Sequence, residues 1–208
     1  MPDHYPVPAD EMVVVEEEIK HSRFITVLFR CVSPEAFKQQ LAQIKARYPG
    51  ANHYCQAFIW SAPEDDSAMG MSDDGEPSGS AGRPMLNVLR GSGVGEVGVV
   101  VIRYFGGVKL GVGGLVRAYS AGVKLALQQV TLVTQVKREV ASLHCDYALL
   151  ADAEHFLSQY DVLVTERLFA AQVMLTLACP VSAKAPVAAA LQRISQGQLK
   201  LRFSGEAP

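Results

Sequence analysis

The first half of the chain alternates runs of β-branched and apolar residues with stretches of helical periodicity. Met12–Glu18 and Phe24–Val32 are rich in Val, Ile and Phe and are separated by the polar turn KHSR, which predicts two strands. Ser33–Tyr48 has apolar residues at helical spacing, with Ser33 as a suitable N-cap and Pro34 in the first turn, and therefore predicts a helix. The later predicted elements are the strands His53–Ser61 and Glu96–Tyr104, a short helix or turn at Pro84–Leu89, and the helix Gly113–Val130.

From Arg138 onward the pattern changes to six elements in the order βαββαβ. This order is typical of a ferredoxin-like domain. We therefore expect an α+β protein of two domains, residues 1–132 and residues 133–208, with the junction near Thr131–Lys137. The predicted elements of the second domain are the strands Glu139–Tyr147, Val162–Phe169, Ala171–Cys179 and Leu199–Phe203 and the helices Leu149–Gln159 and Ser182–Ile194.

Two passages of the first domain fit neither pattern. Ala62–Gly82 has no usable periodicity and leads into the run DDGEPSGSAGRPML (Asp73–Leu86); a loop of this length is usually either functional or disordered. The second passage, VVVIRYFGGVKLGVGGLVRAYSAG (Val99–Gly122), joins a buried strand to a helix. Of 17 glycines, 14 lie between Gly70 and Gly122. Because glycine weakens helices and strands, this crowding indicates positive φ angles or close approach of a partner, and we expect the function in the first domain.

Composition and charge exclude several classes of protein. The chain has 208 residues, is 49% hydrophobic and has a net charge of −2, which excludes a wholly basic nucleic-acid coat but allows a local basic face. The N-terminus lacks the features of a signal peptide, and no apolar run is long enough for a bilayer, so we expect a soluble, cytoplasmic protein without membrane contact. The four cysteines are far apart, which favours buried reduced thiols over zinc ligands or disulfides.

The acidic passage admits two interpretations. Asp73, Asp74 and Glu76 have carboxylates that can hold a hard cation, and Ser78 can act as a nucleophile or ligand. The fixed spacing of an EF-hand loop is absent, however, and so are the nucleophile-elbow and Walker patterns. In the alternative interpretation the carboxylates cap nearby backbone amides of a solvated turn. We expect no metal and no cofactor, and these three carboxylates are the candidates should a metal bind.

The basic passage predicts an anion site. Bare glycine amides and the positive end of the following helix together attract phosphate. Between Arg83 and Lys124 lie six basic residues and one acid, Glu96, a local net charge of +5. In the alternative interpretation the glycines only permit close packing, and Arg103 pairs with Asp73 or Glu76. The candidate anion-binding residues are Arg83, Arg103, Lys109, Arg117, Lys124, Gly106, Gly107, Gly111, Gly113 and Gly114.

The two passages resemble the signature of the IMPACT family, and nearly the whole chain resembles its bacterial branch. The resemblance implies a first domain with a β-α-β sandwich like domain 2 of ribosomal protein S-five, and a ferredoxin-like second domain. In the eukaryotic branch an additional N-terminal domain mediates control of a stress-activated kinase; we expect that domain to be missing here and do not transfer the kinase role. The resemblance supplies no catalytic residues.

Three functions are consistent with these observations. The leading interpretation is a non-enzymatic, translation-associated protein whose first domain binds RNA or the ribosome with little sequence preference. The first alternative is a metal-assisted hydrolase of a phosphorylated or nucleotide substrate, built on Asp73, Asp74 and Glu76. The second alternative is a protein-interaction regulator that acts through the second domain, in which basic and acidic residues nearly balance.

Overall fold

The computed structural model describes residues 4–9 and 12–204 and shows an α+β protein of two units. Internal contacts divide the chain into residues 5–135 and, together with His4, residues 136–204. The predicted α+β class with two domains is confirmed.

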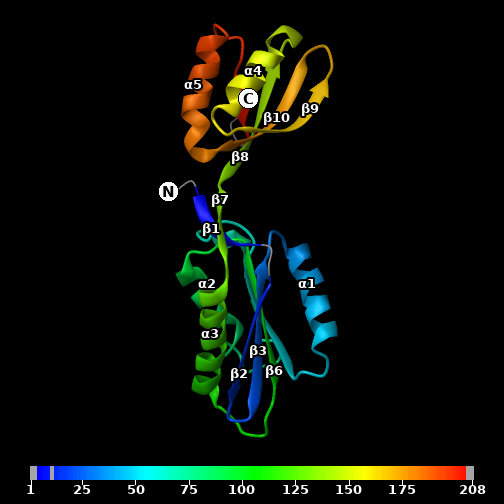
Figure 1. The fold of residues 1–208 in the computed structure, drawn as a ribbon, viewed down its shortest axis with the longest axis vertical. Helices are drawn as coiled ribbons and strands as arrows, with labels where there is room; N and C mark the ends of the chain where they lie inside the picture. Colours follow the sequence, from blue (N-terminus) through cyan, green and yellow to red (C-terminus); the bar gives the residue numbers. More distant parts are fainter. Residues whose placement is uncertain (1–3, 10–11, 205–208) are drawn as a thin grey trace. The chain divides into compact units, whose positions relative to one another are not determined.

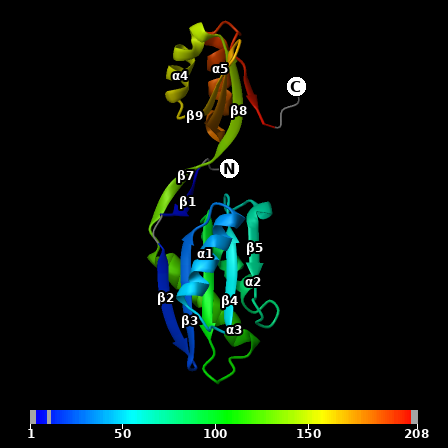
Figure 2. The same cartoon turned by 90° about the vertical axis from the view of Figure 1, so that its right-hand side faces the viewer.

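The first unit is built on a five-stranded sheet with the order β2-β3-β6-β4-β5, in which all neighbours are antiparallel (Figures 1 and 2). Its strands are β2 (Val13–Ile19), β3 (Ser22–Arg30), β4 (His53–Ile59), β5 (Met69–Ser72) and β6 (Val97–Tyr104).

Four of these strands lie where periodicity predicts them, but β5 falls in the segment for which we expected no regular element. It is a short edge strand containing Gly70, and a Cβ atom there would lie 2.3 Å from the Phe58 ring. Close packing against an aromatic neighbour therefore fixes this strand, and the local sequence pattern does not reveal it.

One face of the sheet is covered by α1 (Pro34–Arg47), as Figure 2 shows. Ser33 Oγ accepts a hydrogen bond from the N–H of Ala36, and Pro34 stands in the first turn, so the predicted helix start is confirmed. Phe37 and Ile44 of the helix pack against apolar side chains of the sheet. Those sheet residues are Ile25, Val27, Phe29, Val100 and Ile102.

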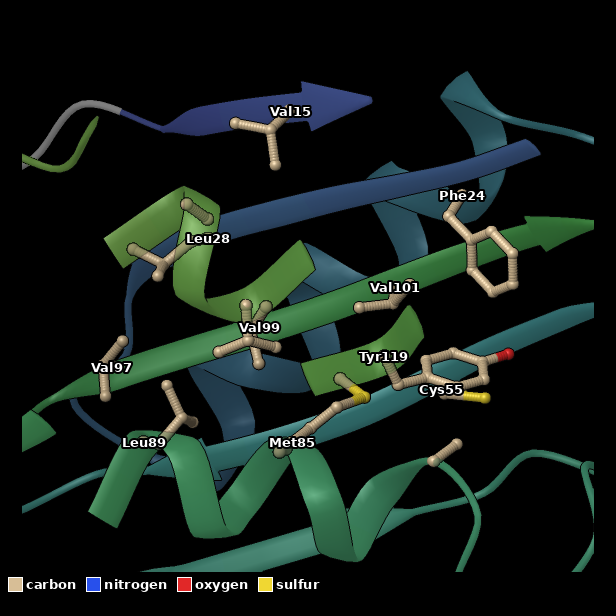
Figure 3. Packing of buried hydrophobic residues seen from close by; sticks show 14 of the residues in the cluster. Val15, Phe24, Leu28, Cys55, Met85, Leu89, Val97, Val99, Val101 and Tyr119 are labelled. Atoms are coloured by element: carbon tan, nitrogen blue, oxygen red, sulfur yellow. The ribbon is translucent and has the colours of Figure 1, made fainter. Parts of the chain in front are cut away.

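The opposite face is covered by α2 (Gly82–Ser92) and α3 (Val112–Gln129). Figure 3 shows Met85 and Leu89 of α2 and Tyr119 of α3 packed with alternate residues of the sheet. Odd-numbered residues of β6 face these helices, while Val100 and Ile102 face α1. The period of two in a strand thus places Arg103, at the end of β6, on the α2–α3 side.

The expected junction takes part in a separate two-stranded sheet. Strand β1 (His4–Pro8) pairs with β7 (Leu132–Val136), and Ala9 N–H donates to the Thr131 carbonyl. Pro6 and Pro8 lie in β1, and Pro is tolerated in strands at the edge of a sheet.

The second unit has the element order βαββαβ and the sheet order β11-β8-β10-β9, which is the ferredoxin-like arrangement. Both helices pack against one face of the sheet, and β9 and β10 pair as an antiparallel hairpin. The elements are β8 (Arg138–Cys145), α4 (Leu150–Ser158), β9 (Leu163–Phe169), β10 (Val173–Pro180), α5 (Lys184–Ile194) and β11 (Leu201–Phe203). Short 3-10 helices complete the chain: η1 (Asp66–Ala68), η2 (Tyr147–Leu149) and η3 (Val181–Ala183).

Two further expectations concern the whole chain. All four cysteines are buried and free of disulfides, as the spacing predicts. Among the residues that the structure describes, no helix has the length and apolar character needed to cross a membrane.

Candidate functional site

Asp73 organises the acidic passage from within. Its carboxylate accepts hydrogen bonds from the backbone N–H groups of Gly79, Ala81 and Gly82, at 2.8, 3.0 and 2.8 Å. Burial alone would raise the pKa of Asp73, but these three donors outweigh it and hold the pKa below its usual value. Asp73 therefore caps the start of α2, as the second interpretation of this passage predicts.

Asp74 fixes the loop to β4. Its Oδ2 accepts a hydrogen bond from the Tyr54 N–H at 2.6 Å, and its carbonyl oxygen lies 2.8 Å from His53 Nδ1. A carbonyl oxygen can only accept, so Nδ1 of His53 carries the proton and Nε2 is left for another partner. That Nε2 lies 3.9 Å from Glu76 Oε1.

Glu76 joins the acidic and basic passages in a buried polar cluster. Its Oε1 accepts from Arg103 Nη1 at 2.6 Å and from the Tyr119 hydroxyl at 2.7 Å. The two charged side chains are only 3% and 6% exposed. The ion pair between the passages, left open by the sequence, is thus present as Arg103–Glu76. A buried carboxylate needs such partners, because an uncompensated charge is costly in the interior.

Arg103 is further enclosed by aromatic rings. Its guanidinium carbon lies 5.5 Å from the centre of the Phe24 ring and 5.4 Å from that of Phe105. Its Nε is buried and has no hydrogen-bond partner among the described residues. Arg103 is therefore held in place by Glu76 and two rings, rather than extended toward solvent like the other candidate cations.

Tyr119 and Cys55 complete the cluster and were not among the predicted site residues. Burial, followed by the neighbouring Cys55 and Glu76, raises the pKa of Tyr119, so its hydroxyl stays protonated and donates to Glu76. Burial raises the pKa of Cys55 to about 12, and its thiol donates to the Asp73 carbonyl oxygen. Figure 3 shows the Tyr119 hydroxyl beside the Cys55 sulfur. Tyr119 could have been found from the sequence, because it is a tyrosine on the apolar side of α3 and a buried hydroxyl requires a hydrogen-bond partner.

The carboxylates proposed for a metal do not converge. Asp73 is bonded to amides at the start of α2, Asp74 to β4, and Glu76 to Arg103 and Tyr119. In the described part of the chain, no group of three or more His, Cys, Asp or Glu side chains is arranged to hold a metal ion. Ser78 lies exposed in the same loop.

The glycines of the basic passage serve different purposes. A Cβ atom on Gly106 would lie 2.0 Å from the His21 carbonyl group, so this glycine permits close packing of the backbone. Gly107 and Gly111 have φ angles of 85° and 72°, in the left-handed region that favours glycine. Gly113 and Gly114 lie in the first turn of α3. Gly106 is therefore explained by packing, and only the glycines at the start of α3 are placed to leave backbone N–H groups available to an anion.

Four of the five predicted basic side chains are exposed and border three hollows around α3. Arg83 and Lys124 line a groove of about 730 Å³ between α2 and α3. Lys109 and Arg103 line a pocket of about 440 Å³, and Arg117 lines a hollow of about 240 Å³ together with Lys20. Within the described residues, no hydrogen bond or ion pair engages Arg83, Lys109, Arg117 or Lys124.

Comparisons with known proteins cover almost the entire chain. The Impact N-terminal domain family matches residues 20–127, and a Domain of unknown function (DUF1949) matches residues 143–198. The chain is 44% identical over 195 residues to IMPACT family member YigZ of Escherichia coli (strain K12), covering 94% of this chain and 95% of that protein. It is 41% identical over 191 residues to an IMPACT family member of Haemophilus influenzae, covering 92% and 93%. A solved structure described as "Crystal structure of an hypothetical protein" has a TM-score of 0.80 and 42% identity over 100% of both chains.

Proposed function

The chain belongs to the IMPACT family, and we propose that it is a non-enzymatic, translation-associated protein whose first unit binds the phosphates of RNA, free or in the ribosome. A cytoplasmic location is part of this proposal. The binding surface is the exposed side of α2 and α3, defined by Arg83, Arg117 and Lys124 and named here the α2–α3 face.

The observation that carries the proposal is a set of cations without carboxylate partners. A surface arginine or lysine that only maintains solubility is commonly found near acidic residues, as Arg90 is near Asp66 at 2.8 Å. The α2–α3 groove holds Arg83 and Lys124, and the described residues that line it include no carboxylate. Uncompensated positive charge along a groove favours a polyanion.

The geometry of α3 supports contacts to successive phosphates. Arg117 and Lys124 are seven residues apart, or about two turns, and so lie on the same side of the helix at a separation of about 10 Å along its axis. Arg83 lies across the groove on α2. Contacts of this kind give affinity that falls with salt and depends little on sequence.

The test is RNA binding by the double variant Arg117→Glu, Lys124→Glu, measured by filter binding over a range of salt concentrations. Both residues are exposed, so the fold should be retained. We expect the slope of log affinity against log salt to become shallower by about 0.7 for each phosphate of a single strand that the variant no longer neutralises. Lys38→Glu on α1, across the sheet, is the matched control and should leave the slope unchanged. An unchanged slope in the double variant would remove the proposal.

The metal-assisted hydrolase gains no support from the arrangement of its three carboxylates. A protein-interaction role for the second unit stays a prediction. It is consistent with three exposed apolar side chains, Val140, Leu163 and Leu168, which are 54%, 50% and 53% exposed. Light scattering on the full chain, with Leu168→Lys as the comparison, tests self-association through this unit.

A further inference from the structure

We propose that the pocket beside Arg103, named here the Arg103 pocket, binds a phosphate monoester. Its walls come from the start of β4, the loop before α2, the end of β6 and the start of α3, and its volume is about 440 Å³, within the range of small-molecule sites. The inference goes beyond RNA binding by the α2–α3 face and does not depend on it. Its lining residues include His53, Glu76, Arg103, Phe105, Lys109 and Val112.

The fixed charges of the pocket favour an anion. Glu76 is its one acidic lining residue among those described. Its charge is already balanced by Arg103, and the Tyr119 hydroxyl donates a further hydrogen bond to it. Lys109 is exposed at the pocket and has no ion-pair partner in the described chain. The charge that remains unbalanced in the pocket is the positive charge of Lys109, which favours an anionic ligand.

The start of α3 adds backbone donors on the same side. Gly111 is the N-cap residue and supplies no side-chain cap, and the first turn, which is fully described, contains no acidic residue. The first N–H groups of a helix have no acceptor within the helix, and the helix dipole favours an anion there. Gly111 and Val112 both line the pocket.

An independent observation is the unsatisfied Nε of Arg103. The Arg103 side chain is 6% exposed, and Nε is buried without an acceptor among the described residues, although Nη1 is bonded to Glu76. Buried donors of charged groups are nearly always paired, because losing water without a replacement acceptor is costly. Arg103 lines this pocket, so the unpaired donor belongs to a residue that a ligand there would contact.

The walls indicate that the anion carries an organic group. Phe105 is 46% exposed and lines the pocket together with Leu110 and Leu115. His53, whose Nε2 lies 3.9 Å from Glu76 Oε1, adds a polar group to the lining. A nucleoside 5′-monophosphate or the 5′-phosphorylated end of an RNA chain provides both parts, with its phosphate at the start of α3 and its ring system against Phe105.

The experiment is calorimetric titration of the full chain with inorganic phosphate, a nucleoside 5′-monophosphate and the unphosphorylated nucleoside. We expect the monophosphate to bind most tightly and the nucleoside at least tenfold more weakly. Short RNAs with a 5′-phosphate or a 5′-hydroxyl separate the two sources. A preference for the 5′-phosphate assigns the pocket to RNA ends, while equal binding of both RNAs with retained monophosphate binding assigns it to free nucleotides.

The decisive variant is Val112→Glu, with Val32→Glu as its matched control. Val112 is 58% exposed at the pocket, and Val32, just before α1, is 57% exposed, so neither substitution should unfold the protein. A carboxylate at Val112 would occupy the start of α3 and repel the phosphate, lowering affinity at least tenfold, as should Lys109→Ala. Thermal melting verifies the fold of each variant. The inference would be overturned if neither phosphate nor the monophosphate bound the unmodified chain at millimolar concentration. It would also be overturned if Val112→Glu left the affinity unchanged. Both outcomes are independent of the RNA salt titration.

Discussion

The helices α2 and α3 lie on the same face of the sheet, yet their N-termini differ in how the backbone N–H groups are satisfied. Asp73 reaches the start of α2 from earlier in the chain and accepts hydrogen bonds from the backbone N–H groups of Ala81 and Gly82 there. It also accepts one from Gly79 in the preceding loop. The start of α3 receives no side-chain cap and is formed by glycines. The comparison indicates that an internal carboxylate makes one helix start a structural element, while the other is left available to an external anion.

The largest expected effect comes from Glu76→Ala, because Glu76 connects the loop before α2 to Tyr119 of α3. Removing it leaves Arg103 charged and buried without its partner, which should lower the free energy of unfolding by about 3–5 kcal/mol. Chemical denaturation measures the change. Glu16→Ala breaks an exposed pair with Arg23 in the same unit and should cost about 1 kcal/mol or less. Similar losses in the two variants would show that the buried pair does not join the loop before α2 to the sheet.

Asp73→Ala should have the next largest effect and should depend on pH. The loss of the α2 cap lowers the free energy of unfolding by about 0.5–2 kcal/mol at neutral pH. Because the pKa of Asp73 is lower in the folded state than its ordinary value of 3.8, its contribution is present above that pH and is lost as the pH falls below it. The two proteins should therefore converge in stability below about pH 3.8.

Denaturation at a series of pH values gives the measurement for Asp73→Ala. The control is Asp66→Ala, which removes a carboxylate that is 75% exposed and should change stability little at any pH. A difference between the unmodified chain and Asp73→Ala that stayed constant from neutral to acidic pH would contradict the assigned cap.

Gly113→Ala should have the smallest effect and should separate stability from binding. A Cβ atom at Gly113 meets only Arg117 Nη1 within 4 Å, at 3.9 Å, so alanine should stabilise the helix by up to about 1 kcal/mol. The added methyl group beside the amides should weaken binding of inorganic phosphate. Gly91→Ala in α2, where nothing lies within 4 Å, should stabilise similarly without affecting phosphate. Thermal melting and calorimetry measure the two effects, and unchanged phosphate affinity in Gly113→Ala would show that the bare helix start is not used.

The sequence predicts the elements whose pattern is local. Ser33, Pro34 and the apolar periodicity define α1, and runs of β-branched residues define β3 and β6. The strand β5 depends instead on the contact of Gly70 with Phe58, which is distant in sequence. Periodicity contains no information about such a contact.

The candidate site was likewise predicted only in part. Clustered charges and glycines located both passages, but the choice of Glu76 over Asp73 as the partner of Arg103 depends on the antiparallel register of β4 and β6. Tyr119 was missed because its position on the apolar stripe of α3 is that of an ordinary core residue. The hydroxyl group becomes informative only once the buried carboxylate beside it is known.

The buried cysteines of the first unit allow the opening of its core to be followed chemically. Burial raises the pKa of Cys31 to about 11 and that of Cys55 to about 12, so very little thiolate exists at neutral pH. Since the thiolate is the reactive form, alkylating reagents and disulfides should modify these sulfurs only when the sheet and its helices separate. The rate of labelling then measures how often this core opens, and no residue has to be substituted to introduce a reporter group.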